Sequence, residues 1–325
     1  MNPLQTVISL VNRIHESEDR NDVESNTNDA DAERTTNRSG DWSVAETPTA
    51  KALRDVVQTA DGPYAVGAEG NVLRRSNEGW ELQIDAGPAT KHNTLTAVDA
   101  TTDGKRIWFA GSSGALGMYD TETGRKYDYS APEERTSTWE AIAVAGEDGD
   151  ERLRVANGSG EVFPVTIDGE GCPQYGEPVK PGSGSTIPAL DFGGGTAYAI
   201  DTSGNVFAET DGEWKDLGIR NAQVNFFDLY ASEDTLLVGG GDGRIYRYDR
   251  ACENWTPVEA GSATLYGIDR ADGETIAVGA SGHVYRRGSR DGWTELDSPV
   301  EDDLRAVALG ETDVAIGAGG VIIER

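Results

Sequence analysis

Along most of the chain, short apolar stretches alternate with glycine-rich turns, and one such pattern occurs seven times. In each copy a strand of small and β-branched residues leads into a turn that ends in glycine, and a second apolar strand follows, as in residues 65–72 and 277–284. The turn glycines recur every 38 to 46 residues and are Gly70, Gly114, Gly160, Gly204, Gly243, Gly282 and Gly320. This is the period of β-propeller blades, each of which is a four-stranded sheet.

Two more strands complete each repeat. An apolar strand precedes each copy, at residues 53–56, 95–98, 139–142, 187–190, 226–229, 265–268 and 304–307. An aromatic-led strand follows the first six, at Trp80, Tyr127, Tyr175, Trp214, Trp255 and Trp293. The seventh copy lacks this strand, whereas an unassigned strand begins at Trp42, before the first repeat. We therefore predict an all-β fold in residues 41–325, a seven-bladed propeller whose ring is closed when residues 41–47 pair with the last blade.

The repeat phrases also resemble a known group of proteins. Residues 277–286 read Ala-Val-Gly-Ala-Ser-Gly-His-Val-Tyr-Arg, and residues 76–80, 211–214 and 289–293 are degenerate versions of the Asp-box, Ser-x-Asp-x-Gly-x-x-Trp. In residues 41–325 the chain thus resembles propellers related to photosystem II assembly factors and to Asp-box repeat proteins. The resemblance implies a fold and leaves the activity open, because propellers serve as enzymes, assembly chaperones and scaffolds.

A different pattern occupies the amino-terminal 40 residues. Residues 1–15 have helical spacing, with Asn2 as a capping residue, Pro3 in the first turn and one apolar face made of Leu4, Val7, Ile8, Val11 and Ile14. Residues 16–40 are acidic and polar and predict a flexible linker. We expect the apolar face to bind a partner protein. The alternatives are docking on the chain's own propeller and a disordered extension.

The net charge is strongly negative: 57 Asp and Glu against 28 Lys and Arg give −29, and only six residues are Lys. This charge excludes a nucleic-acid binder that works by neutralising phosphates. A uniformly acidic, lysine-poor surface is typical of halophilic proteins, and an acidic binder of basic partners is the alternative. Because no apolar run reaches the roughly 18 residues of a membrane helix and no signal peptide follows Met1, we expect a soluble cytoplasmic protein without a membrane span.

Few residues predict a chemical site. The three histidines share no metal-ligand spacing, and Cys172 and Cys252 are expected to be free thiols in separate blades. Asp99, Asp191 and Asp269 occupy one template position in blades two, four and six, so they are candidates to hold a cation such as Ca²⁺ in the channel. The simpler interpretation is that they reflect the general excess of Asp, and no cofactor is otherwise indicated.

These observations favour a non-catalytic protein-interaction or complex-assembly module, a monomeric propeller within a larger complex. We expect long connections at residues 85–94, 130–138 and 178–186 to share one face with the glycine turns and to bind partners, while the helix at residues 1–15 bridges to a second protein. The alternatives are a sialidase-like carbohydrate-active hydrolase, which the Asp-box resemblance implies, and a propeller that binds a small molecule or cofactor.

Overall fold

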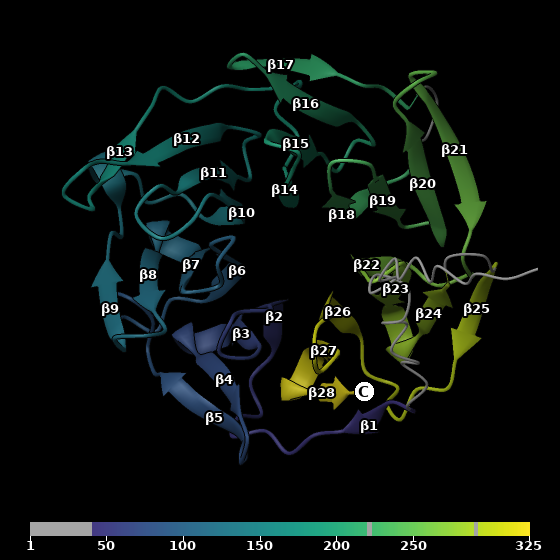
Figure 1. Ribbon diagram of the computed structural model, residues 1–325, viewed down its shortest axis with the longest axis horizontal. Helices are drawn as coiled ribbons and strands as arrows, with labels where there is room; N and C mark the ends of the chain where they lie inside the picture. The colour runs from purple at the N-terminus through teal and green to yellow at the C-terminus, as the bar shows by residue number, and fades with distance from the viewer. Residues whose placement is uncertain (1–40, 220–222, 289–291) are drawn as a thin grey trace, which may run out of the picture. The chain divides into compact units, whose positions relative to one another are not determined.

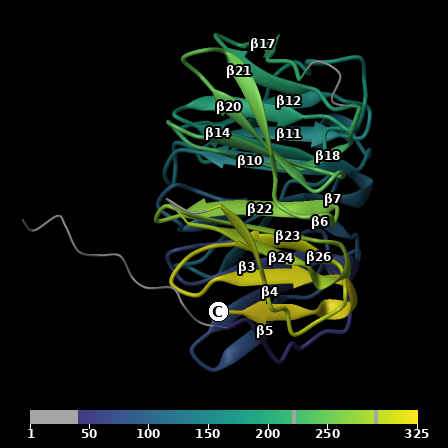
Figure 2. The ribbon, with the colours of Figure 1, turned by 90° about the vertical axis from the view of Figure 1, so that its right-hand side faces the viewer.

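The computed structural model describes residues 41–219, 223–288 and 292–325, and these form seven four-stranded antiparallel sheets around a central channel (Figures 1 and 2). This confirms the predicted seven-bladed propeller. The predicted helix at residues 1–15 and linker at residues 16–40 lie outside the described residues. No helix in the described part of the chain is long and apolar enough to cross a membrane.

Each blade begins at the channel and proceeds outward (Figure 1). The innermost strands are β2 (Leu53–Val57), β6 (Leu95–Ala100), β10 (Trp139–Ala145), β14 (Ala189–Gly193), β18 (Phe226–Ala231), β22 (Leu265–Ala271) and β26 (Leu304–Ala308). The second strands are β3 (Tyr64–Gly67), β7 (Arg106–Gly111), β11 (Arg152–Asn157), β15 (Thr196–Ile200), β19 (Leu236–Gly240), β23 (Glu274–Gly279) and β27 (Val314–Gly317).

The third strands are β4 (Val72–Ser76), β8 (Leu116–Asp120), β12 (Val162–Ile167), β16 (Val206–Thr210), β20 (Arg244–Asp249), β24 (Val284–Arg287) and β28 (Ile322–Glu324). The outermost strands are β5 (Gly79–Ile84), β9 (Arg125–Asp128), β13 (Pro173–Tyr175), β17 (Glu213–Asp216), β21 (Asn254–Glu259), β25 (Trp293–Leu296) and β1 (Ser43–Val44). We number the blades one to seven in the order of their innermost strands, from β2 to β26.

Strand β1 closes the ring as predicted, because it is the fourth strand of the seventh sheet. Ser43 pairs with Glu324 and Val44 pairs with Ile323, in antiparallel register. Only these two residues form the strand, fewer than the predicted range of residues 41–47. The adjacent Trp42 is 5% exposed and packs in the apolar core that blade seven shares with blade six, so its indole anchors the short strand.

The glycine turns fix the connections between blades. Short 3₁₀ turns η1 (Ala68–Gly70), η2 (Ser112–Gly114), η4 (Ala280–Gly282) and η5 (Ala318–Gly320) end in glycine; a further one, η3 (Pro132–Glu134), lies in the connection between blades two and three. Gly282 has φ +75°, and a Cβ placed on it would lie 2.1 Å from the carbonyl oxygen of Val300. The turn therefore packs directly against the connection that leads to the next blade, on the same face of the ring, and only glycine fits there.

Candidate functional site: the channel and its mouth

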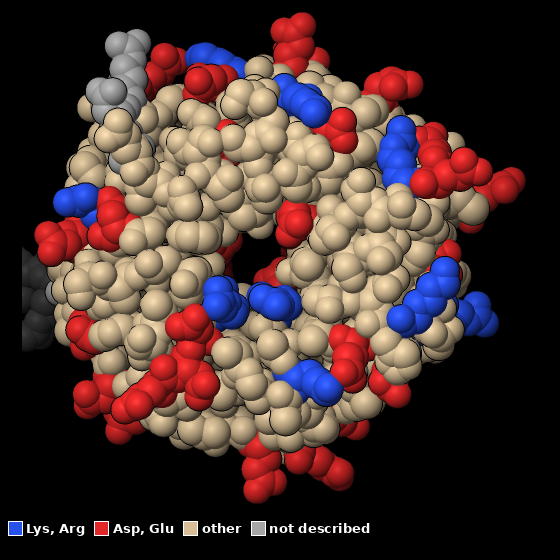
Figure 3. All heavy atoms as spheres, turned by 180° about the vertical axis from the view of Figure 1, so that it is seen from behind, with Lys and Arg blue, Asp and Glu red and all other residues tan. Residues whose placement is uncertain are grey.

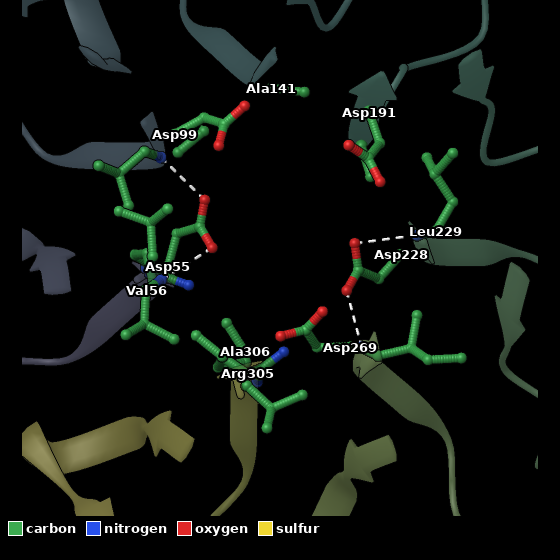
Figure 4. Close-up of a pocket in the computed structure, with 18 of the residues that line it drawn as sticks. Asp55, Val56, Asp99, Ala141, Asp191, Asp228, Leu229, Asp269, Arg305 and Ala306 are labelled. Carbon is green, nitrogen blue, oxygen red and sulfur yellow. Dashed lines mark hydrogen bonds between the residues drawn. The ribbon is translucent and has the colours of Figure 1, made fainter. Parts of the chain in front are cut away.

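The channel is lined by the free edges of the seven innermost strands. An edge strand exposes unpaired backbone N–H groups, which need a hydrogen-bond partner. Five aspartates supply this partner, Asp55, Asp99, Asp191, Asp228 and Asp269, and Figure 4 shows them around the channel.

Each of the five carboxylates accepts two backbone hydrogen bonds, with N to O distances of 2.6 to 2.9 Å. One donor is the residue that follows the aspartate. The other is on the innermost strand of the next blade or, for Asp269, directly after that strand. For Asp55 these donors are Val56 and Val98, both at 2.8 Å. The donors on the next blade are Val98, Val144, Ala231, Ile268 and Leu309. We call each such bridge between blades a carboxylate latch.

Placing these carboxylates among packed strands changes their acidity. Desolvation raises the pKa of Asp55 to about 6 and that of Asp99 to about 7, even though both side chains are partly exposed to the channel. The pKa of Asp191 and that of Asp228 are also raised well above the ordinary range, mainly by desolvation and further by neighbouring channel carboxylates. The backbone N–H donors act in the opposite direction, since they stabilise the ionised form.

The structure thus brings Asp99, Asp191 and Asp269 to one channel, and it adds Asp55 and Asp228, which the sequence analysis did not single out. The sequence does contain a pattern that could have identified them. Counted from the first residue of each predicted innermost strand, Asp55 and Asp228 stand at the third position and the other three aspartates stand at the fifth. In the described residues, no three His, Cys, Asp or Glu side chains are grouped so that they hold a metal ion. Binding of a channel cation remains a prediction, whereas the backbone contacts explain why Asp occurs at these positions.

At one end of the channel, a second ring of side chains forms what we call the mouth. It consists of the second residue of each strand template: Arg54, Thr96, Glu140, Pro188, Phe227, Tyr266 and Arg305. In six blades the pairing register shifts at this residue, as at a β-bulge, and such irregularities redirect a side chain. The cavity of about 380 Å³ that these residues line includes the channel carboxylates.

The mouth combines cations with aromatic rings. The guanidinium of Arg305 lies 4.3 Å from the centre of the Tyr266 ring, and Phe227 packs edge-on against Tyr266 at 5.3 Å. Arg305 also pairs with Asp303 at 2.8 Å. Arg54 is exposed and forms no ion pair with any described residue. Figure 3 shows basic and acidic side chains at the rim of the central opening, and many acidic side chains around the periphery.

Comparison with known proteins identifies the fold. The structure resembles that of YCF48 bound to a D1 peptide, with a TM-score of 0.69 and 14% identity over 88% of this chain and 96% of that one. YCF48 from Cyanidioschyzon merolae gives a TM-score of 0.70 at 15% identity, over 88% of this chain and 98% of that one. The WD40 β-propeller domain of Doa1 gives 0.68 at 12% identity, over 87% and 94%. The fold is a seven-bladed β-propeller. No protein-family model matches the sequence, and a comparison with curated proteins gave no match.

These neighbours confirm the structural part of the resemblance seen in the repeats, since YCF48 is a photosystem II assembly factor. Cys172, Cys252 and His283 lie outside the lining of the channel. Cys172 and Cys252 are free, as predicted, and both are exposed. His283 is partly exposed next to η4, where its Nδ1 lies 2.6 Å from a carboxylate oxygen of Glu295. The apolar face of residues 1–15 lies outside the described residues, so its partner-binding role stays a prediction.

Proposed function

We propose that this chain is a non-catalytic protein-interaction module for complex assembly, and that it binds an extended peptide segment of a partner across the mouth. Two kinds of observation support this. Its structural neighbours include a propeller solved with a bound peptide and a WD40 propeller. The mouth also presents charged and aromatic side chains side by side.

The observation that carries the proposal is the pair Arg54 and Arg305 at the mouth. In a chain with a net charge of −29, these two are the basic residues that line the central cavity. Phe227 and Tyr266 stand next to Arg305 and are partly exposed. Guanidinium groups bind carboxylates with directed hydrogen bonds, and aromatic rings contribute contact area at interfaces. The surface therefore fits a peptide with an acidic group next to an apolar side chain.

A hydrolytic role has weaker support. The resemblance to sialidase-type propellers implies an arginine cluster together with a tyrosine nucleophile. The channel lining has two arginines, Arg54 and Arg305, which are fewer than such a cluster needs. Desolvation raises the pKa of Tyr230, which also lines the channel, and a raised pKa opposes formation of a nucleophilic phenolate. We therefore retain the interaction role and propose no reaction.

We also propose that residues 1–40, which we call the amino-terminal arm, bridge the propeller to a second protein. A flexible linker of about 25 residues has a typical end-to-end distance of roughly 25 to 30 Å, long enough to reach a second protein beside the propeller. Replacing Val7 and Val11 by Asp places two charges on the proposed apolar face. This variant should lose one partner in co-purification and keep the thermal stability of the propeller.

The mouth is tested by reversing its charge. The double variant R54E/R305E should lose its partner by at least tenfold in co-purification from the native host, because glutamates at these two positions would repel an acidic peptide. The matched control is R125E, which makes the same type of change at an exposed residue of outer strand β9. Retention of the partner by the double variant, with a normal melting temperature, would show that the mouth is not the binding site.

A further inference from the structure

The carboxylate latches divide the ring into two arcs. They bridge blades one to two, two to three, four to five, five to six and six to seven. They are missing between blades three and four and between blades seven and one, because blade three presents Ala141 and Ala143 at the two aspartate positions and blade seven presents Ala306 and Ala308. In Figure 4, Ala141 stands in the gap between Asp99 and Asp191.

The junction of blades seven and one has other direct contacts. The side-chain amide of Gln58 donates to the carbonyl oxygens of Ala308 at 3.1 Å and Thr312 at 2.9 Å. Glu324 accepts hydrogen bonds from the indole of Trp80 at 2.7 Å and from Arg75 at 3.2 Å. The chain crosses this junction from β1 to β2, as it crosses every other junction from an outermost strand to the next innermost strand. The polar contacts of Gln58 and Glu324 therefore replace the missing latch here.

We call the junction of blades three and four the open seam. Fewer polar contacts replace the missing carboxylate latch there. Its main polar link is the ion pair of Arg154 and Glu209, with two contacts of 2.7 and 2.9 Å, in which both side chains are mostly buried. Thr186 adds one hydrogen bond to the carbonyl oxygen of Gly158 at 3.0 Å.

The apolar packing at the open seam is lighter than at the neighbouring junction of blades two and three. Of its eight buried apolar residues four are alanines, Ala141, Ala143, Ala156 and Ala199. The neighbouring junction of blades two and three instead buries Trp108, Trp139 and Phe163 in its core. Because the free energy gained by burial grows with apolar area, alanine-rich packing holds two sheets together less strongly.

We propose that the ring opens locally at the open seam, which acts as a gate between two rigid arcs, blades one to three and blades four to seven. Opening here breaks the Arg154–Glu209 ion pair, the hydrogen bond of Thr186, the contact of Arg154 with the Phe192 ring and an alanine-rich apolar interface, and no carboxylate bridge resists it. Opening at a latched junction must break such a bridge. Local openings of this kind occupy the low-stability end of a protein's energy range. The gate is a property of the ring alone and does not depend on the proposed partner.

The sequence provides a matched pair of positions for a direct test. Ala110 in β7 and Ala156 in β11 hold equivalent places in blades two and three, and both are fully buried. Ala110 packs in the junction of blades two and three, and Ala156 packs in the open seam. Cysteine is introduced at one or the other in a full-length chain whose exposed Cys172 and Cys252 are Ser. The rate of reaction with a thiol reagent under native conditions then measures how often each junction opens.

We expect A156C to react at least tenfold faster than A110C. The substitution E209Q should accelerate the reaction at residue 156 and leave residue 110 unchanged, and D99N should do the reverse, because Asp99 latches blades two and three. A141D should slow the reaction at residue 156, since an aspartate at this position can bridge to Leu190 as Asp55 bridges to Val98.

The urea dependence of the thiol reaction rate distinguishes global unfolding from local opening. The rate rises steeply with urea if the whole protein must unfold, and only slightly if the open seam alone opens, because less surface is exposed. If E209Q prevents folding, R154K replaces it, since a lysine cannot make both contacts with Glu209 and should raise only the rate at residue 156. Equal rates at the two positions, or rates that follow global stability in every variant, would overturn the proposal.

Discussion

At the scale of single residues, the fold depends on glycines whose conformation no other residue adopts without strain. The pair Gly319 and Gly320 in η5 shows the distinction. Gly319 has φ +67° and no atom within 4 Å of the place that a Cβ would take, and the equivalent residues Glu69, Ser113 and Ser281 adopt the same left-handed conformation. Gly320 has φ +80°, and a Cβ on it would lie 2.2 Å from the carbonyl oxygen of Thr49.

We therefore expect G320A to destabilise the protein by about 2 kcal/mol or more, because both the backbone conformation and the closing segment must adjust. G319A should cost about 1 kcal/mol, the strain of the left-handed region alone. Urea unfolding of the two variants measures the difference. Equal losses would mean that the contact with Thr49 is not limiting.

The channel aspartates give a second residue-scale prediction, on pH. Their pKa values are raised in the folded state, to about 6 for Asp55 and about 7 for Asp99, so the folded protein holds protons that the unfolded chain has released. Stability should therefore fall as the pH rises from about 4 to 7, and the melting temperature should be higher at pH 5 than at pH 8. In D55N this slope should be smaller, and an unchanged slope would show that Asp55 does not contribute to it.

At the scale of elements, the shortest of the described strands closes the ring. Strand β1 pairs through two residues, yet it covers the edge of β28 and places Trp42 in a buried core. Deleting residues 1–38 should leave the melting temperature unchanged. Deleting residues 1–48 should lower it and promote aggregation, because the edge of β28 and the core around Ile323 are then exposed. If both truncations melt alike, closure by β1 does not stabilise the ring.

The sequence predicted most elements because each blade repeats the same apolar, glycine and aromatic positions. The start of β14 differed from the prediction at residues 187–190: the strand begins at Ala189, directly after Pro188, which has no N–H to donate. The role of the channel aspartates was not predictable from composition, since Asp is common throughout the chain. Only the structure shows that each carboxylate meets an N–H group on the next blade. Likewise, bulges that redirect Arg54 and Arg305 into the mouth leave no mark in the apolar pattern.

At the scale of the whole molecule, the net charge of −29 sets how the protein responds to salt. Few described cations offset the surface carboxylates, and mutual repulsion weakens the folded state in dilute buffer. Because the Debye length falls from about 10 Å at 0.1 M to about 3 Å at 1 M salt, the melting temperature should rise with potassium chloride up to the molar range. A melting temperature that stays constant or falls with salt would contradict the halophilic interpretation.

Crosslinking shows whether a partner peptide lies across the mouth. A photoreactive phenylalanine in place of Phe227 probes the mouth, and the same group in place of Tyr127, an exposed residue of outer strand β9, is the matched control. We expect the group at position 227 to crosslink a partner protein in the native host and R54E/R305E to abolish this crosslink. Capture of the same partner from position 127 and not from position 227 would contradict this expectation.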